Sequence, residues 1–102
     1  MNFNLEPVWR DKRGKEIVDY EIRDFYEKIS EELLEAHAVA CSEHPQAAIF
    51  EIRELLDLMT VCATRINVLA AQHHVTDDDL AEMQNHVVEC NRERGYFDND
   101  DA

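Results

Sequence analysis

Residues 46–72, QAAIFEIRELLDLMTVCATRINVLAAQ, decide the fold of this 102-residue chain. Apolar residues recur through them in alternating steps of three and four, which places their side chains on one face of an α-helix. This first stripe consists of Ile49, Ile52, Leu56, Met59, Ala63, Ile66 and Ala70. A second stripe lies about 160° away around the helix, at roughly 100° per residue. It consists of Glu54, Asp57, Val61, Thr64 and Val68. The sequence therefore predicts a helix from about Gln46 to Gln72 that is covered on two opposite faces, with Glu54 and Asp57 directed toward a covered side.

A helix is also predicted on the N-terminal side, from about Asp19 to Glu43. Two interleaved rows with a seven-residue step form its predicted buried stripe: Ile22, Ile29 and Ala36 in one row, and Tyr26, Leu33 and Ala40 in the other. Pro45 ends this helix, because the residue before a proline is pushed out of the α region. The turn at Pro45 is short, so the first two helices should be antiparallel.

A third helix is predicted to begin at Thr76. Thr76 and Asp79 resemble a capping box, in which each side chain bonds a backbone N–H at the helix start. Leu80, Met83, Val87 and Cys90 give the predicted buried stripe. Gly95, directly after Arg94, is a natural end for this helix.

Composition fits one all-α domain over residues 1–102. The chain has only two glycines and two prolines, which argues against a β-sandwich or barrel rich in tight turns. We expect an irregular segment at 1–15, an acidic tail at 98–102 and a bundle of three main helices between them. Because a chain of this size buries a modest share of its surface, we expect a four-helix core completed across a homodimer or a higher homo-oligomer.

The charge balance narrows the classes of partner. The chain has 23 acidic and 10 basic residues, for a formal charge of −13. A protein that binds duplex nucleic acid normally has the opposite sign, so duplex nucleic acid is not expected as a partner. No apolar run is long enough to cross a membrane. The three cysteines are odd in number and widely spaced, and the N-terminus does not resemble a signal peptide, so we predict reduced thiols and a cytoplasmic location.

Two acidic groups are the candidate site. The first predicted helix carries an E-E-x-x-E group at Glu31, Glu32 and Glu35, and the second carries E-x-x-D at Glu54 and Asp57. Residues three apart share a helix face, so two antiparallel helices can bring these carboxylates together. Converging carboxylates repel one another unless a cation neutralises them, and oxygen ligands favour Mg²⁺ or Mn²⁺. The alternative interpretation is a solvated acidic face without a ligand.

The residues around these groups resemble a known family. EKISEELLEA at 27–36 followed by EIRELLDLMTV at 51–61 is similar to the all-α nucleoside triphosphate pyrophosphohydrolases of the MazG type. VWRDKRGKEIV at 8–18 is similar to the V-R-D-K-x-P-x-I-I opening of the small phosphoribosyl-ATP-pyrophosphohydrolase-like members. RERGYF at 92–97 is similar to their closing K-R-E-E-R-G-G-F stretch.

The resemblance implies Mg²⁺-dependent hydrolysis of a nucleotide between its α- and β-phosphates, releasing a monophosphate and pyrophosphate. The metal ligands it implies are Glu32, Glu35, Glu54 and Asp57. Its catalytic residues would be Glu31 and Glu32, with Glu31 orienting or deprotonating the attacking water. The candidate phosphate-binding residues are Arg10, Lys12, Arg92 and Arg94.

Two other functions stay open at this point. The chain can be a catalytically inactive member of the same fold that senses nucleotides. It can also be an acidic helical adaptor that mimics nucleic acid and binds a basic partner. Metal-dependent release of pyrophosphate separates the enzyme from both alternatives.

Overall fold

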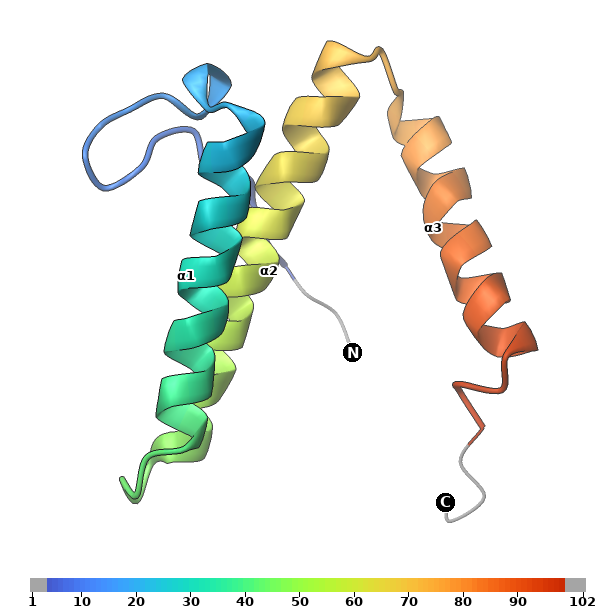
Figure 1. Ribbon diagram of the computed structural model, residues 1–102. Coiled ribbons are helices and arrows are strands. Elements are labelled where there is room, and N and C mark those ends of the chain that lie inside the picture. The colour runs from blue at the N-terminus through green and yellow to red at the C-terminus, as the bar shows by residue number, and fades with distance from the viewer. Residues whose placement is uncertain (1–3, 99–102) are drawn as a thin grey trace. The chain divides into compact units, whose positions relative to one another are not determined.

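The structure is a computed structural model that describes residues 4–98 (Figure 1). Its helical content is 68%, and the described residues contain no β-strand. The elements are a 3-10 helix η1 (Ile17–Asp19) and the α-helices α1 (Ile22–Ala40), α2 (Ala47–Gln72) and α3 (Asp77–Glu93). The predicted all-α class is therefore confirmed. No helix between residues 4 and 98 has the length and apolar character needed to cross a membrane.

Two compact units make up the chain. The first runs to Leu69 and the second begins at Ala70. The first unit contains η1, α1 and most of α2, with α1 and α2 side by side and antiparallel, as expected (Figure 1). The second unit contains the end of α2 and α3. Each is described here by itself.

The first helix is shorter than predicted at both ends. At its start, the Asp24 carboxylate accepts a hydrogen bond from the Glu21 backbone N–H at 2.8 Å, which fixes the helix start after Glu21. The residues before it form η1 instead. At its end, the N–H of Ser42 bonds the carbonyl of Val39 at 3.1 Å, so the chain turns before it reaches Pro45. The predicted limits of Asp19 and Glu43 were therefore wrong by three residues each.

The predicted ends of α3 are confirmed. The N–H of Asp79 donates to Thr76 Oγ1 at 3.1 Å, and the N–H of Thr76 donates to Asp79 Oδ2 at 3.0 Å, which completes the capping box. Gly95 follows the helix with φ of +76°. The N–H groups of Gly95 and Tyr96 bond the carbonyls of Arg92 and Asn91, so the last turn is closed by a Schellman motif.

Phe25 is the centre of the core in the first unit. It is 1% exposed and packs with buried Ile17 and Val68. The Tyr20 ring meets it edge to face, with ring centroids 5.1 Å apart. On its other side the Arg65 guanidinium lies 4.9 Å from the ring centroid. These contacts join η1, α1 and α2.

A hydrogen bond to the buried Thr64 holds the segment before η1 against α2. The N–H of Val8 donates to Thr64 Oγ1 at 3.0 Å, and Thr64 Oγ1 in turn donates to the carbonyl of Thr60 at 2.8 Å. Thr64 is buried, so this hydrogen bond is shielded from water. The irregular N-terminal segment thereby lies against the same face of α2 that carries Glu54 and Asp57.

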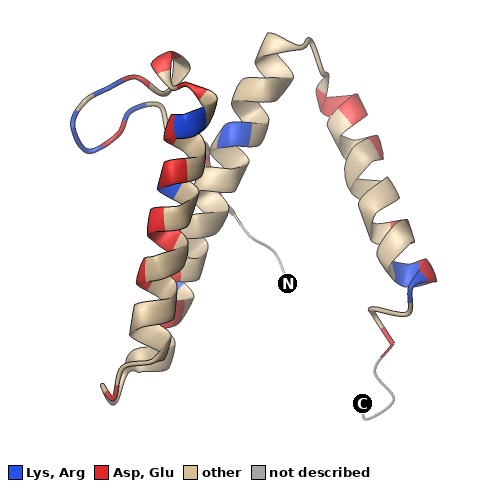
Figure 2. Cartoon of the chain, viewed as in Figure 1, with Lys and Arg blue, Asp and Glu red and all other residues tan. Residues whose placement is uncertain are grey.

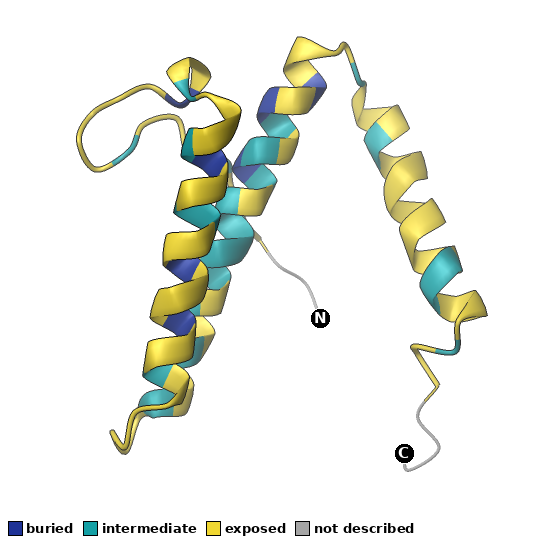
Figure 3. Ribbon diagram, in the orientation of Figure 1, coloured by how far each residue is buried: buried dark blue, intermediate teal, exposed yellow. Residues whose placement is uncertain are grey.

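The two stripes of α2 are each covered in part. In the second stripe Thr64 and Val68 are buried, Glu54 and Val61 are half-buried and Asp57 is exposed (Figure 3). In the first stripe Ile49, Ile52 and Ile66 are more than half exposed, whereas Leu56, Met59 and Ala63 are half-buried and Ala70 is buried.

The stripe predicted for α1 is confirmed only in part, since Ala36 is buried and Ile29 is half-buried. Its buried residues are Phe25, Glu32 and Ala36. Of the predicted stripe, Ile22, Tyr26 and Leu33 are more than half exposed. The aromatic ring of Phe25 and the carboxylate of Glu32 occupy the side that meets α2, and the interleaved apolar row is turned away from it. The predicted stripe of α3 also differs, since no residue of that helix is buried.

Candidate functional site

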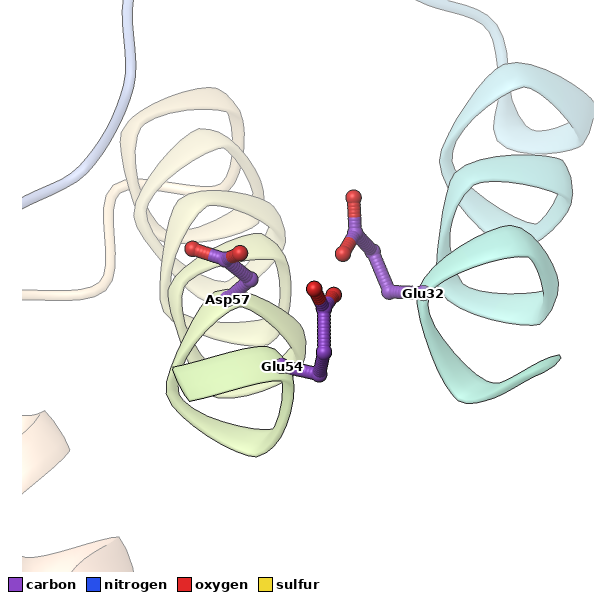
Figure 4. Close-up of side chains that lie close together, drawn as sticks. All are labelled: Glu32, Glu54 and Asp57. Carbon is purple, nitrogen blue, oxygen red and sulfur yellow. The ribbon is translucent and has the colours of Figure 1, made fainter. Parts of the chain in front are cut away.

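Three carboxylates from two helices meet in the first unit. Glu32 extends from α1, and Glu54 and Asp57 extend from adjacent turns of α2 (Figure 4). Each offers one carboxylate oxygen to a group in which all three oxygens lie within 4.8 Å of one another. Glu32 and Glu54 point toward one another between the two helices, and the exposed Asp57 lies beside Glu54 on α2 (Figure 4). Of the first acidic group, Glu32 thus meets Glu54 and Asp57 as expected, whereas the expected contribution of Glu35 is not found in this cluster.

Glu32 is the buried member of this group. Its side chain is 9% exposed, and its Oε1 forms an ion pair with Lys28 Nζ at 3.1 Å. Its Oε2 is buried and has no hydrogen-bond partner among residues 4–98. An unpaired buried carboxylate oxygen is costly, because it has lost water without gaining a donor. This atom is therefore the strongest single indication that the group binds a cation.

Lys28 is the local counter-charge. It lies four residues before Glu32 and three before Glu31, with Nζ 3.1 Å and 3.5 Å from their carboxylates. Burial acts to lower the pKa of Lys28, but its contacts with Glu32 and Glu31 outweigh burial and raise that pKa. One ammonium group cannot offset the four carboxylates of Glu31, Glu32, Glu54 and Asp57. The site keeps an excess of negative charge.

The donor set suits a hard divalent cation. Octahedral Mg²⁺ holds opposite oxygens about 4.2 Å apart and neighbouring oxygens about 3 Å apart. Carboxylate oxygens already within 4.8 Å of one another reach such spacings by small rotations of the side chains. Mg²⁺ also keeps several non-protein ligands, so three carboxylates leave positions for water and phosphate oxygens. Glu32, Glu54 and Asp57 thus fit the ion that the sequence predicts.

A cavity of about 520 Å³ opens beside the carboxylates. Glu31, Glu32 and Asp57 line it together with the basic residues of the N-terminal segment. Figure 2 shows these basic residues gathered on the segment that precedes the acidic first helix. A cavity lined by both cationic side chains and carboxylates can hold an anion together with a metal ion.

The predicted site residues outside the carboxylate group fall into three sets. Glu31, Arg10 and Lys12 line the cavity beside the carboxylate group. Glu35 is exposed and lies outside the group formed by the other three predicted ligands, so its role as a ligand stays a prediction.

Arg92 and Arg94 belong to the second unit. Arg92 forms an ion pair with Glu89, three residues earlier on α3. The Arg94 guanidinium lies 5.9 Å from the centre of the Tyr96 ring. Both are exposed, and binding of phosphate by either one stays a prediction.

Among the cavity residues that sequence reasoning missed are Asp11, Arg13, Tyr20 and Lys28. Lys28 could have been predicted from the sequence, because residues three and four apart on a helix are neighbours. Asp11 and Tyr20 could not have been predicted, since their contact depends on how the irregular segment folds back. The Tyr20 hydroxyl donates to Asp11 Oδ2 at 2.8 Å, and this bond holds the pKa of Asp11 below its ordinary value. Burial, and then the same bond, raises the pKa of Tyr20 to about 12.

Comparisons with protein-family models, with curated proteins and with solved structures find no match for this chain.

Proposed function

We propose that the chain is a Mg²⁺-dependent nucleotide pyrophosphohydrolase of the MazG type. It cleaves between the α- and β-phosphates of a nucleoside triphosphate or a related nucleotide. The observation that carries the proposal is the carboxylate of Glu32, which is buried, has one oxygen without a partner, and faces Glu54 and Asp57 across two helices. The cavity beside it, with its basic wall, supports an anionic substrate. With three free cysteines, we place this activity in the cytoplasm.

The residues of the first unit have separate roles in the proposed reaction. Glu32, Glu54 and Asp57 hold the cation, which when bound offsets phosphate charge and activates an attacking water. Mn²⁺ would be accepted as well, because it takes the same oxygen ligands. Glu31 is exposed on the cavity wall, where its carboxylate can orient a water molecule and accept its proton. Arg10 and Lys12 bind phosphate oxygens from the opposite wall.

Direct attack by water is the expected chemistry. The chain contains only Gly14 and Gly95, so it has no glycine-rich phosphate loop of the kind used for γ-phosphoryl transfer. Among the described residues that line the cavity there is no serine or cysteine to act as a nucleophile. Attack at the α-phosphorus makes pyrophosphate the leaving group, and the products are then a monophosphate and pyrophosphate.

A nucleotide screen tests this proposal. The common NTPs and dNTPs are incubated with the full chain and Mg²⁺, and pyrophosphate is measured. At least one nucleotide should give pyrophosphate in amounts that EDTA abolishes. Tight nucleotide binding without turnover would favour the inactive sensor instead. Binding to a basic protein with neither nucleotide binding nor turnover would favour the acidic adaptor.

Arg94 is expected to act on the substrate and not on the fold. It is exposed and lies directly after α3, where a guanidinium can bind phosphate through two parallel hydrogen bonds. Arg94→Ala should raise KM or lower kcat with little change in Tm. Arg53→Ala, which removes another exposed arginine, is the matched control. Equal losses of stability and activity in Arg94→Ala would assign Arg94 a structural role.

We also propose that the chain is at least a dimer. The α2 helix of 26 residues is apolar on two opposite faces along its later half, and Ile49, Ile52 and Ile66 of the first stripe are more than half exposed. A single further helix can cover only part of a face that runs the length of α2, so a four-helix core shared by two chains is the simplest closure. Sedimentation should give a dimer or larger at micromolar concentration, and Ile52→Lys on the open face should weaken it. A monomeric wild-type chain would contradict this proposal.

A further inference from the structure

The segment 10–16 is a tight hairpin beside the cavity. An isolated antiparallel bridge joins its two ends. The Gly14 N–H donates to the Asp11 carbonyl at 3.1 Å, so residues 11–14 close a four-residue turn with Lys12 and Arg13 at its centre. Gly14 follows with φ of +84°, which residues with a side chain rarely adopt. The turn thus displays two adjacent cations at its tip.

The side chain of Asp11 holds this turn in place. Its Oδ1 accepts hydrogen bonds from the backbone N–H groups of Arg13 and Lys15, both at 2.9 Å. Its Oδ2 accepts the hydrogen bond from the Tyr20 hydroxyl, and the ring of Tyr20 packs on the core residue Phe25. One carboxylate therefore organises the turn and ties it to the core of the first unit.

Lys12 and Arg13 differ from the other cations of the hairpin. Arg10 and Lys15 are engaged by acidic side chains at 3.4 Å and 3.5 Å. Lys12 and Arg13 form no ion pair with any residue that the structure describes, and both line the cavity that Asp57 also lines. Two cations without an ion pair, on a fixed turn that lines the same cavity as Glu32 and Asp57, are a suitable pair for a polyphosphate.

Building on the proposed function, we propose that Asp11 is a positioning residue that fixes Lys12 and Arg13 as a two-cation clamp for the terminal phosphates of the nucleotide. The clamp would hold the phosphates that leave as pyrophosphate, while the carboxylate group serves the α-phosphate. Because the turn is ordered before the ligand arrives, less conformational entropy is lost on binding.

Two variants of Asp11 with equal charge test the positioning role. Asp11→Asn keeps an oxygen that accepts the two backbone N–H bonds, whereas Asp11→Ala keeps none. Binding of inorganic tripolyphosphate to the full chain with Mg²⁺ is measured by calorimetry. Asp11→Asn should bind at least as tightly as wild type, since it loses a repelling charge. Asp11→Ala should bind roughly tenfold more weakly than Asp11→Asn, because two long side chains must then be ordered on binding. Equal affinities of the two variants would overturn the positioning role.

Two further variants keep the inference testable if Asp11→Ala is poorly folded. Lys12→Ala combined with Arg13→Ala should weaken tripolyphosphate binding by about tenfold or more. Tyr20→Phe removes one hydrogen bond to Asp11 and keeps the ring that packs on Phe25, so its affinity should fall between those of wild type and the double variant. In Asp11→Asn, ultraviolet titration should show the pKa of Tyr20 below its wild-type value of about 12. Wild-type affinity in the double variant would exclude the clamp.

Failure of this inference is distinguishable from failure of the proposed function. If the chain releases pyrophosphate from nucleotides but the double variant keeps wild-type affinity, the enzyme assignment holds and the clamp is wrong. If the chain binds tripolyphosphate through the turn but hydrolyses no nucleotide, the clamp holds and the enzyme assignment is wrong.

Discussion

Asp57→Asn is expected to abolish Mg²⁺-dependent release of pyrophosphate and to leave the helical content almost unchanged. Asp57 belongs to the three-carboxylate group and is exposed, so its side chain contributes to the site without contributing to the core. The amide keeps the shape of the side chain but removes the charge that binds a hard cation. Residues that only orient a metal ligand cost about 10- to 100-fold in activity when mutated, so loss of a ligand should exceed about 100-fold.

Glu51→Gln is the matched control for Asp57→Asn. It removes the same charge from the same helix, at a position outside the carboxylate group. Turnover of this control should stay within a factor of about two of wild type, as expected for a change away from the site. Steady-state kinetics and circular dichroism measure both variants. Full turnover in Asp57→Asn would show that the cation site has been assigned to the wrong residues.

Phe25→Ala is expected to cause the largest loss of stability. Phe25 is the most buried large side chain among the described residues, and it contacts η1, α2 and the Arg65 guanidinium. Truncation of a buried phenylalanine to alanine typically costs about 3–5 kcal/mol, from lost transfer free energy and the cavity left behind. Small domains have a free energy of unfolding of only about 5–15 kcal/mol, so this variant should lose a large part of it.

Arg23→Ala, two residues away on the same helix, is the control for Phe25→Ala. The Arg23 side chain is 82% exposed and pairs with Glu27 at 3.5 Å. An exposed pair of this kind contributes less than about 1 kcal/mol. Urea unfolding followed by circular dichroism should therefore separate the two variants clearly. Similar midpoints for Phe25→Ala and Arg23→Ala would show that the core of the first unit is not centred on Phe25.

The sequence was informative about the helices and about which carboxylates face each other. The alternating steps of three and four along α2 placed Glu54 and Asp57 in line with Thr64 and Val68, and the structure buries Thr64 and Val68, half-buries Glu54 and leaves Asp57 exposed. The capping box at Thr76 placed the start of α3 correctly. Periodicity gives the faces of a helix, and a short turn fixes which helix lies antiparallel to it.

Periodicity could not identify which face each helix presents to its neighbour. On α2, Ile49 and Ile52 of the more apolar stripe are exposed, while Glu54 of the other stripe is half-buried. On α1 the carboxylate of Glu32 is buried while the neighbouring Leu33 is exposed. An apolar pattern assigns burial by hydrophobicity, so it fails where a charged side chain is buried. The hairpin at 10–16 was also out of reach, because its shape depends on the hydrogen bonds of Asp11.

The position of an oxygen label tests directly whether water attacks the α-phosphorus of the nucleotide. Hydrolysis of a cleaved nucleotide by the wild-type chain is carried out with Mg²⁺ in ¹⁸O-water, and the products are analysed by mass spectrometry. Attack of water at the α-phosphorus predicts a monophosphate that carries one label and a pyrophosphate that carries none. Label in orthophosphate, or in pyrophosphate alone, would contradict attack of water at the α-phosphorus.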